Sequence, residues 1–302
     1  MKRQVTTVID KDLCIGCGMC VSVCPSETIT MLDDKAVISG DRSIACGHCE
    51  AVCPVGAVRV NELSDETSVL STLAVDTSWM PHGKFDTAEL VRLMRSRRSC
   101  RNYKTDPVER PLLEDLVRIG ISAPSGSNCQ AWTFTVLPDR KAVEGFGKAI
   151  IPFFKKLNRT AENSLLRGLL NVLGKKELSD YYRDYYPQIE EKIGQWEESG
   201  RDWLFWGAPA AIVVGSRPGA SCPAEDALLA SGNILLAAHA LGLGTCLIGF
   251  AVAAMKKDST IKEKIGIPSE ERVYAVIVVG YPDETYHALT RRKESVVRYF
   301  EG

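Results

Sequence analysis

Two kinds of apolar pattern run along the last two thirds of the chain and predict a domain of helices and strands. Unbroken apolar runs in "APAAIVVGS" and "RVYAVIVVGYP" are typical of buried strands. Asp86 and Glu89 have the spacing of a capping pair at a helix start, and an apolar stripe follows them. Further elements are predicted as helices over Pro111–Ile121 and Ala224–Leu241 and as a strand beginning near Trp132.

The pattern divides the chain into three parts. Residues 1–62 are too few to build much of a core, so we expect bound metal to hold them together as one small module. Residues 63–85 are rich in Ser, Thr and Asp, show no sustained period and are predicted to be a linker. Residues 86–302 form the larger domain, within which residues 144–206 have a helical period that favours either a cover over a binding pocket or dimer packing.

Composition and charge narrow the classes of protein. The chain has 302 residues, of which 45% are hydrophobic, and a net charge of −1, which argues against a general nucleic-acid-binding protein. No apolar run reaches the roughly 18–20 residues that cross a membrane. The N-terminal "MKRQVTTVIDKD" lacks the apolar segment of a signal peptide. We therefore expect a cytoplasmic protein without membrane contact.

Seven of the eleven cysteines lie between residues 14 and 53 and indicate metal rather than disulfides. The run "CIGCGMCVSVCP" is C-x2-C-x2-C-x3-C-P, which resembles the bacterial 2×4Fe–4S ferredoxins. Its cysteines are too closely spaced for one tetrahedral zinc ion, and the run recurs in part at "SIACGHCEAVCP". The pattern predicts two cluster sites with exchanged fourth ligands. The first is Cys14, Cys17, Cys20 and Cys53; the second is Cys24, Cys46 and Cys49.

The second site has a serine, Ser43, where its fourth cysteine is expected. A serine oxygen binds iron only as the alkoxide and is harder and more basic than a thiolate. Three outcomes stay open: a 4Fe–4S cubane with Ser43 or water on one iron, a 3Fe–4S cluster, or an empty site.

A basic stretch, "RLMRSRRSCRNYK", follows the first predicted helix and has six basic residues and no acidic one. It is compatible with a solvated basic face, with a nucleic-acid patch that the overall charge disfavours, or with a phosphate site. In the last case arginine forks and a serine hydroxyl would bind the phosphate oxygens.

Three later motifs favour the phosphate site. "SAPSGSNCQAWTF", "AAHALGLGTCLIGF" and "VGYP…RRK", in this order behind the basic stretch, resemble the nitroreductase family of FMN flavoproteins over about residues 86–302. "GLGTCLIG" follows a helix rather than a strand and so fails the context of a dinucleotide-binding glycine motif. The resemblance implies an α+β fold with a mostly antiparallel sheet, and an intertwined homodimer with FMN at each of two subunit boundaries.

The resemblance also implies roles for individual residues. The phosphate-binding stretch corresponds to Arg97, Arg98, Ser99 and Arg101, and the C-terminal phosphate contact to Arg292 with Arg291 or Lys293. The segment that a partner subunit lays against the flavin ring corresponds to Pro124, Ser125 and Gly126. Polar positions near that ring correspond to Asn128 and Gln130, and the turn at its redox-active nitrogen to Ile248 and Gly249. The family usually has proline where this chain has Ala131.

Together the parts predict an iron–sulfur flavoprotein oxidoreductase. Clusters pass single electrons, and FMN can collect two and deliver them to an acceptor. The predicted acceptor is a small nitro compound, quinone or activated alkene, and the predicted electron donor is a low-potential ferredoxin or NAD(P)H. No catalytic side chain is predicted, because the chemistry would be centred on the flavin. The alternative is an electron-transfer subunit that supplies a protein partner and has no small substrate.

Overall fold

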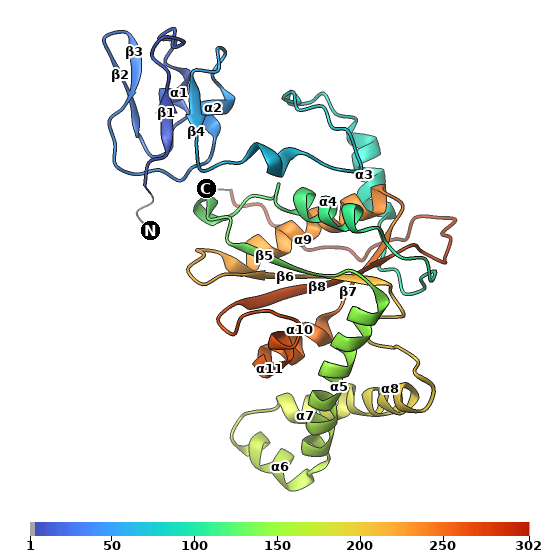
Figure 1. Ribbon diagram of the computed structural model, residues 1–302. Helices are drawn as coiled ribbons and strands as arrows, with labels where there is room; N and C mark the ends of the chain where they lie inside the picture. The colour runs from blue at the N-terminus through green and yellow to red at the C-terminus, as the bar shows by residue number, and fades with distance from the viewer. Residues whose placement is uncertain (1–3, 302) are drawn as a thin grey trace.

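The structure, a computed structural model, describes residues 4–301 as a small N-terminal domain beside a larger α+β domain (Figure 1). The small domain has two antiparallel strand pairs, β1 with β4 and β2 with β3, and two one-turn helices. Its elements are β1 (Thr7–Ile9), α1 (Met19–Ser22), β2 (Ile29–Leu32), β3 (Lys35–Ile38), α2 (His48–Ala51) and β4 (Val58–Val60).

The two halves of the small domain repeat one local structure. Each short helix follows a cysteine and a left-handed glycine, Gly18 before α1 with φ 72° and Gly47 before α2 with φ 75°. Glycine adopts this conformation without the penalty that a Cβ brings. The buried core of the domain consists of small aliphatic residues and three of the cysteines, so its apolar interior is slight. This agrees with the expectation that metal holds the segment together.

The predicted linker contains a short 3-10 helix, η1 (Asp65–Ser68), and then lies against the larger domain. The buried carboxylate of Asp115 accepts hydrogen bonds from the backbone N–H groups of Ser71 and Thr72 at 2.8 and 2.7 Å. Burial opposes ionisation of Asp115, but hydrogen bonds from the Thr72 hydroxyl, from these two N–H groups and from Arg118 outweigh it and hold its pKa below the usual value. The linker is therefore attached to the larger domain at its midpoint.

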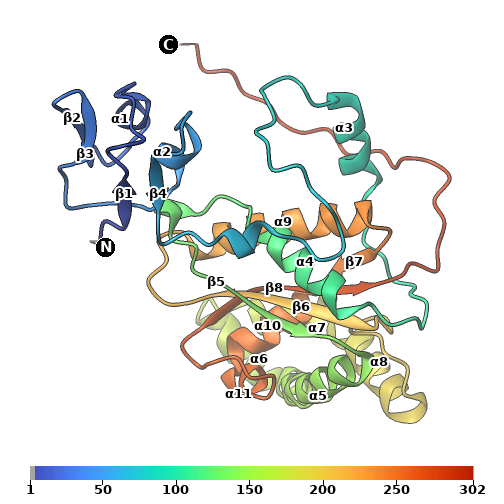
Figure 2. The same ribbon diagram turned by 45° about the horizontal axis from the view of Figure 1, so that its top comes forward.

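The larger domain is built on a four-stranded antiparallel sheet of order β5-β6-β8-β7. Helices α3, α4 and α9 lie on one face and α5, α10 and α11 on the other (Figures 1 and 2). All seven residues of β6 are buried, as its unbroken apolar run predicts. The strands are β5 (Trp132–Leu137), β6 (Ala210–Ser216), β7 (Gly244–Leu247) and β8 (Arg272–Gly280).

The helices agree closely with the sequence pattern. Asp86 caps α3 by accepting hydrogen bonds from the N–H groups of Ala88 and Glu89. Glu89 pairs with Arg92, so only half of the expected reciprocal capping box is present. The helices of the two faces are α3 (Thr87–Ser96), α4 (Arg110–Gly120), α9 (Pro223–Ala240), α10 (Gly249–Lys257) and α11 (Ser259–Glu263).

Residues 140–199 form a helical extension beneath the sheet (Figure 1). It consists of α5 (Arg140–Glu162), α6 (Ser164–Val172), α7 (Glu177–Asp184) and α8 (Tyr186–Ser199). Helix α5 packs Val143, Phe146 and Ile150 into the core under the sheet, α8 adds Ile189 and Ile193 to it, and α6 and α7 extend beyond it. Among residues 4–301 no helix combines the length and the apolar character that a membrane span requires.

Candidate functional site: two cysteine-lined cavities and an arginine-flanked pocket

The first cavity gathers the four cysteines predicted for cluster one. Cys14, Cys17, Cys20 and Cys53 line one small cavity between the α1 turn and the loop before β4. The four thiols surround a space, as the ligands of a polynuclear cluster do. The structure thus brings Cys53 beside Cys20, which is 33 positions earlier in the chain. This is the grouping predicted for the first cluster, in which the second cysteine run supplies the fourth ligand.

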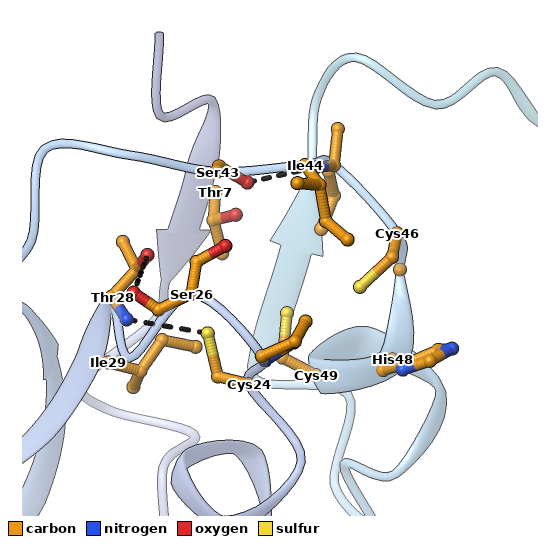
Figure 3. A pocket seen from close by; sticks show the side chains of 14 residues that line it. Thr7, Cys24, Ser26, Thr28, Ile29, Ser43, Ile44, Cys46, His48 and Cys49 are labelled. Carbon is orange, nitrogen blue, oxygen red and sulfur yellow. Dashed lines mark hydrogen bonds between the residues drawn. The ribbon is translucent and has the colours of Figure 1, made fainter. Parts of the chain in front are cut away.

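The second cavity gathers the second set (Figure 3). Cys24, Cys46 and Cys49 point their sulfur atoms into one small cavity, and Ser43 lies in its wall. The Ser43 hydroxyl accepts a hydrogen bond from the N–H of Ala45 at 3.0 Å. The three thiols and the serine are therefore close enough to serve one cluster, with Ser43 held in a backbone turn.

Backbone N–H groups are directed at the sulfur atoms in both cavities. The N–H of Thr28 lies 3.4 Å from the sulfur of Cys24, and the N–H of Ala57 lies 3.2 Å from that of Cys53. Burial opposes ionisation of Cys24, but the hydrogen bond from Thr28 and those from neighbouring backbone N–H groups outweigh it and lower its pKa. Such N–H donors stabilise thiolates, which is the form that binds iron. The donor sets of both cavities fit iron–sulfur clusters.

The repeated local structure of the two halves also explains the left-handed backbone at Gly16 and Ala45. Backbone hydrogen bonds from Ala36 and Gly16 lower the pKa of Cys14. Gly16 stands two residues after Cys14 with φ 72°, and Ala45 stands two residues after Ser43 with φ 48°. Ser43 thus occupies in the second half the turn that Cys14 occupies in the first. Ala45 tolerates the left-handed conformation there, whereas a Cβ on Gly16 would lie 2.2 Å from the carbonyl oxygen of Asp34.

Gly16→Ala is expected to destabilise the small domain by at least about 2 kcal/mol more than Gly18→Ala. Both glycines have φ 72°, so both substitutions cost the left-handed strain, but only the Gly16 Cβ meets a backbone atom; nothing lies within 4 Å of a Cβ on Gly18. Iron content and thermal unfolding of the anaerobic protein measure the difference. Equal losses in both variants would show that this close approach does not matter.

The predicted phosphate residues gather at one end of the larger domain. Ser99 lies beside Thr245 of β7, where Cys100 N–H donates to the Thr245 carbonyl at 2.9 Å. Arg97 is half-buried, and burial together with the charges of Arg98 and Arg292 lowers its pKa. None of these three arginines forms an ion pair within the described residues 4–301. Mutually repelling guanidinium groups without a carboxylate are a donor set that fits a phosphate.

The predicted flavin-ring segment lies at the other end of α9. Gly126 N–H donates to the carboxylate of Asp226 at 2.8 Å in the first turn of α9, next to the short 3-10 helix η2 (Gly126–Asn128). At the opposite end, burial and the nearby charge of Arg97 lower the pKa of His239. Asp226 and His239 are separated by about 20 Å of helix. The structure therefore does not bring Pro124, Ser125 and Gly126 to the arginines of the same chain.

Asn128 joins the two domains. Its side-chain amide donates to the carbonyls of Ile44 and Ala45 at 3.0 and 2.9 Å, in the loop that carries Ser43 and Cys46. Gln130 donates to the Asn128 side-chain oxygen at 3.1 Å. The second cysteine cavity therefore adjoins the η2 loop. Sequence reasoning placed Asn128 and Gln130 at a flavin ring and missed this contact, because no local pattern pairs residues 84 positions apart.

Beneath the sheet a large cavity opens to solvent beside Ile248 and Gly249. Arg101 of the basic stretch also lines it, so the cavity adjoins the predicted flavin residues. The helical extension supplies much of the wall, including Tyr181 and Tyr185. The extension thus lines a pocket, as the first of its two expected roles requires; the second role, dimer packing, stays a prediction.

Residues 285–301 lie outside the body of the domain, beyond the hydrogen bonds that Asp283 and Glu284 make with Asn102. No regular element follows β8 in the described chain, and the C-terminal segment runs away from the sheet (Figure 2). Arg291 and Arg292 are both exposed, and the charge of Arg292 contributes to lowering the pKa of Arg97. Apolar side chains of the segment are open to solvent, with Tyr299 87% and Phe300 96% exposed.

Family models match both parts of the chain. The nitroreductase family model matches residues 94–281, and the 4Fe–4S dicluster domain model matches residues 13–57. The chain is 26% identical over 213 residues to an iodotyrosine deiodinase of Thermotoga neapolitana, which covers 70% of this chain and 97% of that protein. It is 24% identical over 196 residues to a putative NADH dehydrogenase/NAD(P)H nitroreductase of Archaeoglobus fulgidus, at 65% and 87% coverage.

Among solved structures, the chain is similar to a nitroreductase with bound FMN from Bacteroides fragilis NCTC 9343. The identity is 20%, the TM-score 0.49, and the match covers 70% of this chain and 99% of that one. These relatives match the larger domain.

Proposed function

Because this chain belongs to the nitroreductase family and carries a 4Fe–4S dicluster domain, we propose that it is an oxidoreductase whose clusters supply electrons to FMN for reduction of a small electron-poor molecule. The acceptor class we propose is a nitro compound, a quinone or an activated alkene. The proposed donor is a reduced ferredoxin or NAD(P)H; a relative in Archaeoglobus fulgidus carries the name NAD(P)H nitroreductase.

The residues that would hold each group are those gathered above. Arg97, Arg98, Ser99 and Arg292 would bind the FMN phosphate, and the two cavities would each hold one iron–sulfur cluster through their cysteines. When bound, the clusters supply single-electron transfer and FMN supplies the step between one and two electrons. The chain itself positions these groups, donates backbone N–H bonds to the thiolates and covers the acceptor pocket with helices α5 to α8.

Asn128 would fix the path that electrons take from the small domain to the larger one. Its two hydrogen bonds hold the Ser43–Cys46 loop against the η2 loop, whose neighbours Pro124 to Gly126 are proposed to face a flavin. The second cluster site, rather than the first, is therefore the one on the flavin side. Ser43, the serine in place of the expected fourth cysteine, belongs to this second site. A change in the properties of that cluster would therefore affect electron transfer to the flavin.

We further propose a homodimer that shares each flavin between chains. One chain cannot bring its own arginines and its own Pro124–Gly126 to one flavin, since the length of α9 separates them. A partner related by two-fold symmetry can supply the missing half. Exposed apolar residues support an interface: Leu228 and Leu229 of α9 are each about half exposed, and the C-terminal Tyr299 and Phe300 are open.

The large cavity is the observation that favours an enzyme with a small substrate over a subunit that only relays electrons. A relay to a protein partner needs an exposed docking surface, whereas a large pocket lined in part by aromatic side chains suits a small molecule. The pocket adjoins Ile248 and Gly249, the proposed flavin contact.

An acceptor screen tests the proposal. Anaerobic protein loaded with FMN and clusters is mixed with reduced ferredoxin, or with NADH or NADPH in parallel, and with nitroarenes, quinones and activated alkenes. We expect multiple turnovers on at least one acceptor class. Rapid flavin reduction without turnover on any acceptor would favour the relay and refute the proposed enzyme.

A further inference from the structure

Seven aromatic side chains contribute to the wall of the large cavity. Phe154, Trp203 and Phe250 meet edge to face, with ring centroids 5.8 to 6.4 Å apart, and Tyr185 adds an edge contact to Phe250 at 5.8 Å. These rings come from α5, the turn between α7 and α8, the segment before β6 and α10, so the helical extension and the sheet domain build one wall. An aromatic wall favours a planar or aromatic ligand body, which stacks on it or meets its ring edges.

The charged residues that line the cavity are mostly positive. Arg101, Lys175, Lys192, Lys256 and Lys257 line it, and the acidic residue in the wall is Glu177 alone. None of the five cations forms an ion pair with a carboxylate in the part of the chain that the structure describes. Lys256 and Lys257 also end α10, where positive charge is favourable for the helix, so their position has a local reason.

Lys192 has no such local reason. It stands in the middle of α8, half-buried, with its ammonium 5.7 Å from the ring of Trp203 and 5.8 Å from that of Trp206. The guanidinium of Arg101 lies 5.7 Å from the centroid of the same Trp206 ring. Aromatic faces attract a cation, but they leave its hydrogen-bonding capacity unused. A ligand carboxylate can accept these hydrogen bonds while its body contacts the indoles.

We infer that the cavity selects aromatic or conjugated acceptors that carry an acidic group, and that Lys192 is the residue that recognises the acid. This deepens the proposed function by naming its substrate class. Lys192 is a specificity-determining residue; it takes no part in electron transfer.

Binding of a charged and a neutral isostere tests the inference without turnover. Titration calorimetry and quenching of tryptophan fluorescence are measured on the oxidised, fully loaded protein with trans-cinnamate and with trans-cinnamamide. We expect cinnamate to bind about tenfold more tightly, as a charge-assisted contact predicts. Lys192→Met should bring the ratio near one, and Lys192→Arg should retain most of it.

Lys148→Met is the matched control, because Lys148 is exposed on α5 and does not line the cavity. It should leave the preference unchanged. A wild-type ratio of one or less would overturn the inference, as would an unchanged ratio in a folded Lys192→Met protein. A protein that prefers cinnamate yet reduces no acceptor would retain this inference and refute the proposed function, so the two failures are distinguishable.

Discussion

A mixed dimer of an Arg97→Ala/Arg98→Ala chain with a Pro124→Glu chain is expected to bind one FMN, although neither homodimer binds it well. The two arginines and the Pro124 loop lie at opposite ends of α9, so the proposed flavin site takes its phosphate contacts from one chain and its ring contacts from the other. In the mixed dimer one site receives both defects and the second site receives none.

The expected effect is large. Each lost guanidinium contact to a phosphate costs roughly 1.5–3 kcal/mol, so removing both weakens FMN binding by about a hundredfold or more. Pro124 is exposed in the single chain, so a glutamate is accommodated in the fold while its charge and bulk oppose a ring placed against it. Differently tagged chains allow the mixed dimer to be purified, and FMN absorbance gives its content per dimer.

The reciprocal arrangement is the control. A chain with all three substitutions, paired with a wild-type chain, places one defect in each shared site and should bind little FMN. If instead each chain built its own site, this second dimer would hold one FMN and the first would hold none. Arg95→Ala, on the exposed part of α3, should leave FMN content unchanged in either combination. A folded, FMN-loaded monomer would contradict the shared site directly.

Ser43→Cys is expected to make the second cluster more stable in air and more like the first. Ser43 occupies the turn that Cys14 occupies in the other half, with the Ala45 N–H directed at its oxygen at 3.0 Å, so a thiolate there finds the same backbone donor. A cysteine ionises near pH 8.5, far more readily than a serine hydroxyl, and its thiolate is the softer ligand for iron.

Iron analysis and low-temperature electron paramagnetic resonance on anaerobic and air-exposed protein measure this change. Ser26→Cys is the matched control, since Ser26 lines the same cavity without occupying the ligand position. Two outcomes would decide the role of Ser43, which the sequence leaves open. About four irons per wild-type chain with no second signal would mean that Ser43 marks a lost cluster. An identical response of both cysteine variants would show that position 43 is not a ligand position.

The cysteine spacing by itself determined the grouping of the cluster residues. Thiols two residues apart must fold around one centre, and a fourth cysteine before a proline must reach the other; the structure gathers the same two sets. The strands and helices of the larger domain were equally readable, because apolar periodicity is a local signal and β6, α4 and α9 lie within two residues of their predicted bounds. The nitroreductase family was recognisable from four short motifs in order, and the family model matches residues 94–281.

Only the tertiary structure decided which of these parts meet. The distance between Arg97 and Gly126 depends on α9 lying across the face of the sheet, and the link from Asn128 to Ile44 depends on how two domains dock. The cavity depends on α5 to α8 folding back so that Lys192 and Trp203 meet the turn at Ile248. Each of these contacts joins residues distant in the chain, and no local spacing encodes them, because they follow from packing of whole elements.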